Sequence, residues 1–254
     1  MIEHAILLSA GQGSRMLPLT ADLPKCLIEC SGRTLIAWQI EMLARQGVRR
    51  IDVVTGFRAD LVDAHLAAID DPRVTITTRF NPFYKVADNL GSCWIARDAM
   101  DGDFLILNGD TLVSEEIVAK VQAGSDWLIA VTVDIKPAYD SDDMKVNRDP
   151  ATGRLNRIGK TLTAAESNAE SIGFLAFRGE GAELFRNAVR AAMRTPEGVQ
   201  HWYLKVIDSL AATGKVGTLA IDGLGWAEVD FLNDVEIAQR LTVRWTDGSA
   251  AKVA

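Results

Sequence analysis

The sequence predicts a doubly wound α/β fold built on a mostly parallel sheet. Strand and helix signals alternate through the first half of the chain, and the first of them, the apolar run 5–9, is followed by glycine-rich sequence. A continuous apolar run of this length is typical of a strand buried on both faces. Strands separated by helices pair in parallel through right-handed crossovers, and such sheets bind ligands at the carboxyl ends of their strands.

The elements of the first half follow from periodicity and from end signals. The segment 34–46 has apolar residues at helical spacing, with Thr34 as N-cap and Gly47 as a stop, which predicts a helix. Further strands are expected at 51–55, 74–78, 104–107 and 127–133, and further helices at 59–69, 90–99 and 115–122.

From about residue 134 the alternation changes, and short strand signals are joined by polar turns. Strands are expected at 144–146, 155–158, 171–177, 216–221 and 226–229, and helices at 181–193, 202–212 and after Phe231. We interpret this portion, 134–230, as an antiparallel addition to the same sheet. The prediction is one domain over 1–247, followed by a loose tail at 248–254.

Composition narrows the class of protein. With 254 residues, 48% of them hydrophobic and 24% charged, the chain has the balance of an ordinary soluble globular protein. Its formal net charge of −7 gives no global electrostatic footprint for nucleic acid. The apolar run at 5–10 is too short for a signal or membrane segment, so we expect a cytoplasmic protein with no membrane partner. Cys26, Cys30 and Cys93 have no metal-binding spacing.

A glycine-rich turn follows the first strand. Residues 8–16 read Leu-Ser-Ala-Gly-Gln-Gly-Ser-Arg-Met, and Pro-Leu-Thr and Pro-Lys follow at 18–20 and 24–25. Such a turn lets backbone N–H groups approach a polyphosphate, because no Cβ blocks the approach. Arg15 and Lys25 add cations that can neutralise charge on a transferred phosphoryl group. The pattern is neither a Walker loop nor a dinucleotide fingerprint, and for the glycines alone a tight turn without a ligand is the alternative.

Carboxylates stand at two further positions of interest. Asp110 closes the segment Leu-Ile-Leu-Asn-Gly-Asp at 105–110, where a hard oxygen ligand at the end of a strand suits Mg²⁺. An Asn-Gly-Asp turn without a metal is the equal alternative. Late in the chain, alternation in 226–231 puts Glu228 and Asp230 on one face of a strand.

The string from Gly11 to Lys25 closely resembles the signature of the nucleotidyltransferases that activate sugar phosphates and related phosphorylated alcohols. The resemblance implies a Rossmann-like, GT-A-like core and transfer of a nucleoside monophosphate from an NTP to a phosphorylated acceptor, with Mg²⁺ as cofactor and pyrophosphate as product. The catalytic residues it implies are Arg15, Lys25 and Asp110; the nucleotide-binding loop comprises Ala10, Gly11, Gly13 and Ser14; the metal ligands are Asp110 and Asp230, with Glu228 as the alternative to Asp230.

The nucleotide preference follows from a departure from the sugar-activating pattern. Where that branch shows a Gly-Thr-Ala-type run near the nucleobase, this chain has Asn89 and Ser92 in an Asn-x-x-Ser pattern. The pattern, with 142–146 and 158–160, resembles the branch that includes phosphocholine cytidylyltransferases. The resemblance therefore favours CTP and assigns Asn89 and Ser92 to nucleotide binding. A role in capping a helix is the alternative for both residues.

The acceptor site is expected in the second portion of the chain. By resemblance, Lys160 holds the acceptor's phosphate and Glu170 contacts its organic part, with an exposed hairpin lysine as the alternative for Lys160. A quaternary amine would also need an aromatic wall. The aromatic residues available for it are Tyr84, Trp202, Tyr203 and Trp226, for which core or lid packing is the alternative, and the binding assignments favour Trp202 and Trp226. The resemblance thus divides the chain into a nucleotide-binding half, 1–133, and an acceptor-binding portion, 134–230.

The expected reaction is cytidylyl transfer from CTP to a small phosphorylated alcohol such as phosphocholine, or to a phosphonate or polyol phosphate. Within the class, the alternative is a sugar-1-phosphate nucleotidyltransferase that uses UTP, dTTP or GTP. Outside it, the alternatives are a nucleotide-sugar-dependent glycosyltransferase and a non-catalytic nucleotide sensor. A homodimer is left open as the assembly.

Overall fold

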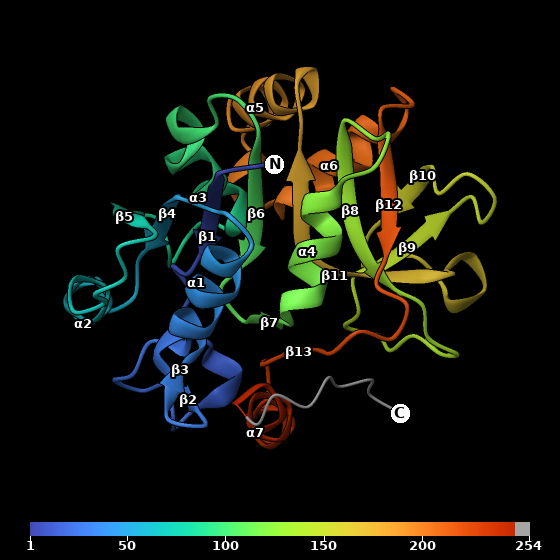
Figure 1. Cartoon of the computed structure of the whole chain (residues 1–254). Coiled ribbons are helices and arrows are strands. Elements are labelled where there is room, and N and C mark those ends of the chain that lie inside the picture. Colours follow the sequence, from blue (N-terminus) through green and yellow to red (C-terminus); the bar gives the residue numbers. More distant parts are fainter. Residues whose placement is uncertain (247–254) are drawn as a thin grey trace.

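The computed structural model describes residues 1–246, and these form a nine-stranded mixed sheet with helices packed on both faces (Figure 1). The strand order is β10-β9-β11-β6-β1-β4-β5, and β8 and β12 extend from β11. The tail predicted at 248–254 lies outside the described residues. Within 1–246, no helix combines the length and the apolar character needed to cross a membrane.

The parallel part of the sheet comes from the first half of the chain, as predicted, except that the strand expected at 127–133 pairs antiparallel with β11 and belongs to the second part. It contains β1 (His4–Leu8), β4 (Arg50–Thr55), β5 (Thr75–Phe80) and β6 (Phe104–Asn108). Strand β1 pairs in parallel with both β4 and β6, so it lies inside the sheet. Its residues alternate between the two cores, with Ala5 and Leu7 in one and Ile6 in the other. This two-sided burial explains the continuous apolar run in the sequence.

The second part of the sheet is mainly antiparallel and continues the first. Its strands are β8 (Ile129–Asp134), β9 (Lys145–Arg148), β10 (Leu155–Ile158), β11 (Ala169–Phe177) and β12 (Val216–Ala220). Strand β11 pairs antiparallel with β6, β8 and β9, and therefore joins the two parts. Strand β12 pairs in parallel with β8, whereas the sequence predicted only antiparallel pairing in this portion.

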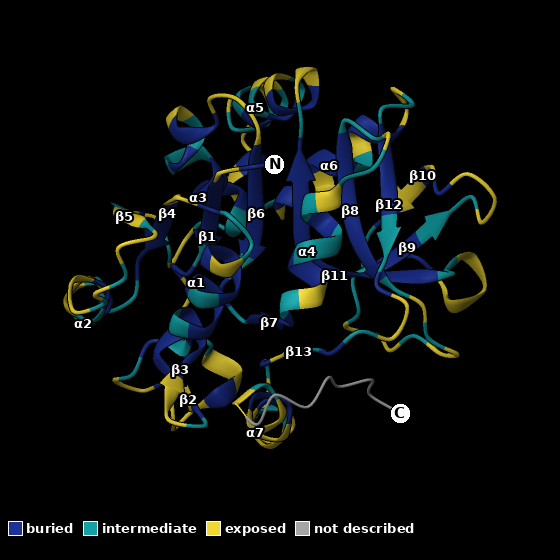
Figure 2. Ribbon diagram, viewed as in Figure 1, coloured by how far each residue is buried: buried dark blue, intermediate teal, exposed yellow. Residues whose placement is uncertain are grey.

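Helices cover both faces of the sheet, and Figure 2 shows the central strands β1, β6, β8 and β11 coloured mostly as buried. The helices are α1 (Leu35–Arg45), α2 (Ala59–Ala67), α3 (Asn89–Ile95), α4 (Glu115–Ala123), α5 (Glu180–Ala192), α6 (Tyr203–Ala211) and α7 (Leu232–Thr246). One core contains residues of α1, α4 and α7, and the other contains residues of α3, α5 and α6. Helix α1 begins where predicted, because Thr34 Oγ1 accepts a hydrogen bond from Ala37 N at 3.2 Å.

Two short ribbons lie at the carboxyl-terminal edge of the sheet. One pairs β2 (Glu29–Cys30) with β3 (Arg33–Thr34), and the other pairs β7 (Thr111–Val113) with β13 (Trp226–Glu228). The second ribbon connects the end of the chain with the segment after β6. It therefore determines which late residues meet Asp110.

Candidate active site

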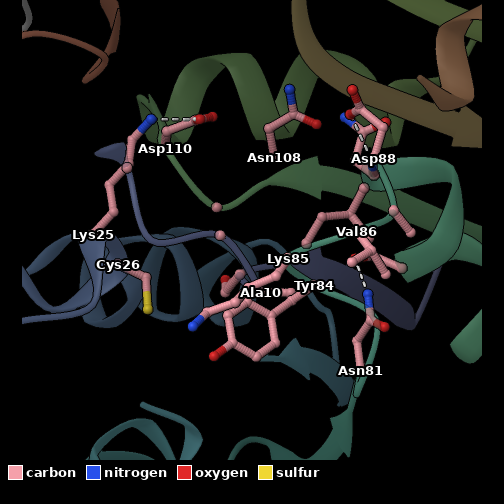
Figure 3. A pocket seen from close by; sticks show the side chains of 18 of the residues that line it. Ala10, Lys25, Cys26, Asn81, Tyr84, Lys85, Val86, Asp88, Asn108 and Asp110 are labelled. Carbon is pink, nitrogen blue, oxygen red and sulfur yellow. Dashed lines mark hydrogen bonds and ion pairs between the residues drawn. The ribbon is translucent and has the colours of Figure 1, made fainter. Parts of the chain in front are cut away.

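A cavity of about 530 Å³ opens at the carboxyl ends of the parallel strands. Most of its lining comes from three chain segments: 8–13 after β1, 81–92 from the end of β5 into α3, and 108–110 after β6. Lys25, Cys26, Val199 and Gln200 complete it. Figure 3 shows Lys25 and Asp110 on one side of the cavity and Asn81 and Asp88 on the other. The cavity thus occupies the edge of the sheet that the predicted fold assigns to ligands.

Gly11 and Gly13 of the first loop differ in the reason for which glycine stands there. Gly13 has a φ of +77°, and a Cβ there would lie 2.8 Å from Lys25 Cδ, so the fold itself requires glycine at this position. Gly11 lines the cavity, and a Cβ added to it would meet no protein atom within 4 Å. Nothing in the described chain demands glycine at 11, whereas a ligand that approaches the backbone would demand it.

Lys25 joins the carboxylates of two distant segments. Its Nζ donates to Asp110 Oδ2 at 2.8 Å and to Asp230 Oδ1 at 2.5 Å. Arg15 Nη2 donates to the other oxygen of Asp230 at 2.5 Å, and its guanidinium lies 5.0 Å from the centre of the Phe231 ring. The structure therefore brings Arg15, Lys25, Asp110 and Asp230 into one cluster.

The charges in this cluster stabilise one another. Burial favours a lower pKa for Lys25, but the carboxylates of Asp110 and Asp230 outweigh it and hold the lysine pKa above its ordinary value. Burial also favours a higher pKa for Asp230, and there Lys25 and Arg15 prevail and hold the pKa below its ordinary value. Both residues are consequently ionised at neutral pH.

The ribbon of β7 and β13 places Asp230 beside Asp110. Glu228 pairs with Thr111, the residue after Asp110, and Val229 N donates to Asp110 O at 3.0 Å. Asp234 then accepts from the backbone N–H of Asp230 at 2.8 Å and fixes the chain as it enters α7. The pairing of β7 with β13 therefore brings the carboxylates of Asp110 and Asp230, which are far apart in the sequence, close together.

The donor set at this point fits a hard divalent cation. Asp110, Glu228 and Asp230 each offer an oxygen within 4.8 Å of the others. Within residues 1–246, Asp110 Oδ1 is buried and has no hydrogen-bond partner, as expected of an oxygen reserved for a ligand. Glu228 as a residue is exposed, but protein atoms crowd its carboxyl, and this crowding together with Asp110 and Asp230 raises its pKa to about 8.

At the other side of the cavity, the structure corrects the helix-capping alternative. Asp88 is the N-cap of α3, and its side chain accepts from Asn89 N at 2.7 Å. Asn89 Oδ1 instead accepts from Tyr203 N at 2.9 Å, and Ser92 lies within the helix. Asn89 and Ser92 both line the cavity and neither caps α3, although the Asn89 side chain accepts from the first backbone N–H of α6.

A second polar cluster lies where β8, β9 and β11 meet. Lys136 Nζ is 2.6 Å from Glu170 Oε2 and 3.1 Å from Asp143 Oδ2. Strand register places Glu170 opposite Asp134, which accepts a hydrogen bond from Trp226 Nε1 at 3.0 Å. Burial and then the neighbouring Asp143 raise the pKa of Glu170 to about 8, against the opposing effect of Lys136.

The remaining predicted residues lie around this centre. Lys160 Nζ lies 5.2 Å from the centre of the Trp202 ring, and its charge helps to lower the pKa of Asp230. Lys160, Trp202, Glu170 and Trp226 do not line the 530 Å³ cavity, and neither does Ser14 at the start of a short 3-10 helix. The nucleotide and acceptor assignments thus fall into two neighbouring groups of residues.

Sequence reasoning gave no role to several residues at the site. Ser9, Asn81 and Asn108 line the cavity, and Asp134 and Lys136 belong to the second cluster. Most of them stand at or just after the carboxyl end of a strand: Ser9 follows β1, Asn81 follows β5 and Lys136 follows β8. Reading every polar residue at those strand ends as a candidate would have found them.

Comparison with known proteins identifies the family. Residues 4–143 match the family described as nucleotidyl transferase. The chain belongs to this family. It is an enzyme of the nucleotidyltransferase type with the fold of its relatives, and several of these relatives carry cytidylyltransferase or CTP transferase names.

Two curated relatives illustrate the range of this nucleotidyltransferase family. The chain is 26% identical to the CTP:phosphoglutamine cytidylyltransferase of Campylobacter jejuni, over 92% of this chain and 98% of that protein. It is 32% identical to the 2-aminoethylphosphonate cytidylyltransferase of Lancefieldella rimae, over 62% of this chain and 61% of that protein.

Solved structures of other nucleotidyltransferases share the fold. The inositol-1-phosphate CTP transferase of T. maritima superposes with a TM-score of 0.77 at 20% identity, covering 98% of both chains. The CTP:phosphocholine cytidylyltransferase of Streptococcus pneumoniae superposes with a TM-score of 0.75 at 18% identity, covering 95% of this chain and 100% of the other.

Proposed function

We propose that this nucleotidyltransferase transfers CMP from CTP to a small phosphorylated alcohol or phosphonate and releases pyrophosphate. The observation that carries the proposal is the cluster in which Lys25 contacts both Asp110 and Asp230 beside the glycine loop. Cations, carboxylates and the backbone of the glycine loop meet there at one cavity. This combination suits a triphosphate that is attacked at its α-phosphorus.

The chain's own groups account for the main steps. Backbone amides near Gly11 would bind the triphosphate, and Lys25 and Arg15 would neutralise charge as the α-phosphorus is attacked. An oxygen of the acceptor's phosphate forms the new P–O bond while the bond to pyrophosphate breaks. The attacking phosphate is already an anion, so no general base is needed. Mg²⁺, held by Asp110 and Asp230 with Glu228 as the alternative ligand, would supply further charge neutralisation at the phosphates.

Two observations support CTP as the nucleotide. The Asn89-x-x-Ser92 pattern resembles the cytidylyltransferase branch, and both residues line the cavity opposite the Lys25 cluster. The relatives named above are cytidylyltransferases or CTP transferases. With the triphosphate bound at the Lys25 side of the cavity, the base of the nucleotide would lie at the opposite side, next to Asn89 and Ser92.

The second cluster supports an acceptor that carries a positive charge. Because its pKa is raised to about 8, Glu170 is mainly protonated at neutral pH, so the negative charge of this cluster comes from the carboxylates of Asp134 and Asp143 and exceeds the single positive charge of Lys136. The Trp226 indole donates a hydrogen bond to Asp134. An ammonium group on the acceptor would balance the excess negative charge. We assign its phosphate or phosphonate to Lys160, whose charge reaches the Asp230 carboxylate.

Pyrophosphate release from a panel of nucleotides and acceptors tests the function. We expect activity with CTP and Mg²⁺ on phosphocholine or 2-aminoethylphosphonate, less on inositol 1-phosphate, and loss of activity in Asp110→Asn. Activity confined to UTP, dTTP or GTP with a hexose 1-phosphate would reject both CTP and the acceptor class. Transfer of sugar from a nucleotide sugar would instead favour the glycosyltransferase alternative, and nucleotide binding without turnover would favour the sensor.

A further inference from the structure

The side chain of Asn81 holds a fixed orientation at the base of the cavity. Asn81 follows β5, is 1% exposed and lines the cavity. Its Oδ1 accepts from the backbone N of Phe83 at 2.9 Å. A backbone N–H can only donate, so the amide oxygen must face Phe83 and the amide nitrogen must face the other way.

This orientation determines how Ser92 hydrogen bonds. Asn81 Nδ2 lies 3.2 Å from Ser92 Oγ and donates to it, so the Ser92 oxygen acts as the acceptor in this pair. Ser92 is 4% exposed and also lines the cavity. Among residues 1–246, the hydroxyl makes no other hydrogen bond, and its own hydrogen is therefore free to donate to a ligand in the cavity (Figure 3 shows the bond of Asn81).

A hydroxyl that presents its hydrogen distinguishes the two pyrimidines. The ring nitrogen N3 of cytosine is an acceptor, whereas N3 of uracil carries a hydrogen and is a donor. A Ser92 donor pairs with the first and opposes the second. If Asn81 were absent, the hydroxyl could turn and accept, and it would serve either base.

We propose that Asn81 is a positioning residue that fixes the Ser92 hydroxyl as a donor and so makes the site select cytosine over uracil. The inference rests on the proposed function, because it takes the Ser92 side of the cavity as the base site. Asn81 acts through Ser92, and its effect is on the choice of nucleotide.

Asn81→Asp provides the sharpest test. The ionised carboxylate of this variant still accepts from Phe83 N, but it also accepts from Ser92, so the hydroxyl hydrogen turns away from the cavity. We expect the ratio of kcat/KM for CTP to that for UTP to fall about tenfold or more, because a mispaired buried polar group replaces a hydrogen bond. Lowering the pH should restore the ratio, since a protonated carboxyl group donates to Ser92 as the amide of Asn81 does. The measurements stay above the pH at which N3 of CTP is itself protonated, and over that range the wild-type ratio should not change.

Ser92→Ala provides a second test that does not depend on the folding of the first variant. It deletes the donor at a helical position where alanine is favourable, and its CTP and UTP affinities, measured by calorimetry, should differ by less than in the wild type. An equal fall in kcat/KM for CTP and for UTP in Asn81→Asp would overturn the inference. An unchanged difference between the CTP and UTP affinities in Ser92→Ala would also overturn it. A wild type that prefers UTP would also overturn it while leaving nucleotidyl transfer intact. No pyrophosphate release with any nucleotide would reject the proposed function itself.

Discussion

At the scale of single residues, Lys25 occupies the space between the carboxylates that a metal would share. Its Nζ contacts Asp110 and Asp230 at 2.8 and 2.5 Å. In this arrangement the lysine neutralises the carboxylates, and a metal must compete with it for their oxygens. When a triphosphate enters, its phosphates offer the ammonium group a second set of partners.

Lys25→Met should therefore change turnover and metal binding in opposite directions. Loss of a preorganised cation should lower kcat about 10²–10³-fold, equivalent to about 2.7–4 kcal/mol. In the absence of nucleotide, the same variant should bind Mn²⁺ more tightly than the wild type, because the competing ammonium group is gone. Electron paramagnetic resonance of free Mn²⁺ measures this affinity. Asp230→Asn is the matched control and should weaken Mn²⁺ binding; unchanged Mn²⁺ affinity in Lys25→Met would show that the lysine does not compete.

Gly11→Ala tests whether a ligand approaches the first loop. The added methyl group meets no protein atom within 4 Å, so the melting temperature should stay near that of the wild type. It should, however, raise the Kd for CTP by about tenfold or more, corresponding to at least about 1.4 kcal/mol. Gly159→Ala is the control, because its Cβ also meets nothing within 4 Å but Gly159 does not line the cavity. Calorimetric CTP affinities that are the same in both variants would place the triphosphate elsewhere.

Sequence reasoning identified the candidate site residues that belong to a motif or a strand signal better than those that only tertiary contacts bring to the site. Arg15 and Lys25 stand in one short string, and Asp110 and Asp230 each end or follow a strand signal, so motif and strand pattern together found them. Asn81 and Lys136 stand in loops with no motif of their own. Their partners, Ser92 for one and Glu170 for the other, come from different elements that only folding brings near.

At the scale of elements, strand register places the polar groups of the second cluster. Strand β11 places Glu170 opposite Asp134, the last residue of β8, and β13 brings Trp226 to Asp134. The sequence predicted the positions of β8, β11 and β13, with ends that differ from the observed ones by a few residues. It did not predict the pairing of β13 with β7, because a three-residue strand such as Thr111–Val113 has too few residues to show a period.

Glu170→Gln should flatten the dependence of stability on pH. The pKa of Glu170 is raised from 4.5 to about 8, so the folded state binds this proton more tightly than the unfolded chain does. Its contribution to stability is present below pH 4.5 and is lost as the pH rises to about 8. The lowered pKa of Asp143 acts at more acid pH, with the opposite sign.

Melting temperatures measured across this range check the prediction. The wild type should lose stability as the pH rises, and Glu170→Gln should lose less. Glu116→Gln, which changes an exposed carboxyl on α4, is the control and should follow the wild type. Parallel curves for the wild type and Glu170→Gln would contradict the raised pKa.

At the scale of the whole molecule, one sheet runs through both portions of the chain, the first with its parallel strands and the second with its mainly antiparallel ones. Strand β11 is buried along its whole length and pairs with β6 of the first portion and with β8 and β9 of the second. The sequence predicted this continuity from the change in rhythm near residue 134. It gave no strand order, because order depends on contacts between segments far apart in the chain.

A shared sheet predicts cooperative unfolding. In urea, tryptophan fluorescence and far-ultraviolet circular dichroism should report one transition with the same midpoint, because neither portion can lose β11 and keep its core. Trp38 on α1 lies in the first portion, and Trp202, directly before α6, lies in the second, so the tryptophans report on both. Two separated transitions would show that the portions are independent domains.

The central claim is that Asp110 and Asp230, together with the glycine loop and Lys25, form the site that binds a metal and a triphosphate. Anomalous diffraction from crystals grown with CTP and Mn²⁺ tests it most directly. We predict a Mn²⁺ peak bound by Asp110 and Asp230, a triphosphate against the backbone of Gly11, and Lys25 Nζ on a phosphate oxygen. A Mn²⁺ peak or a nucleotide in another part of the molecule, with Lys25 still bound to both carboxylates, would contradict it.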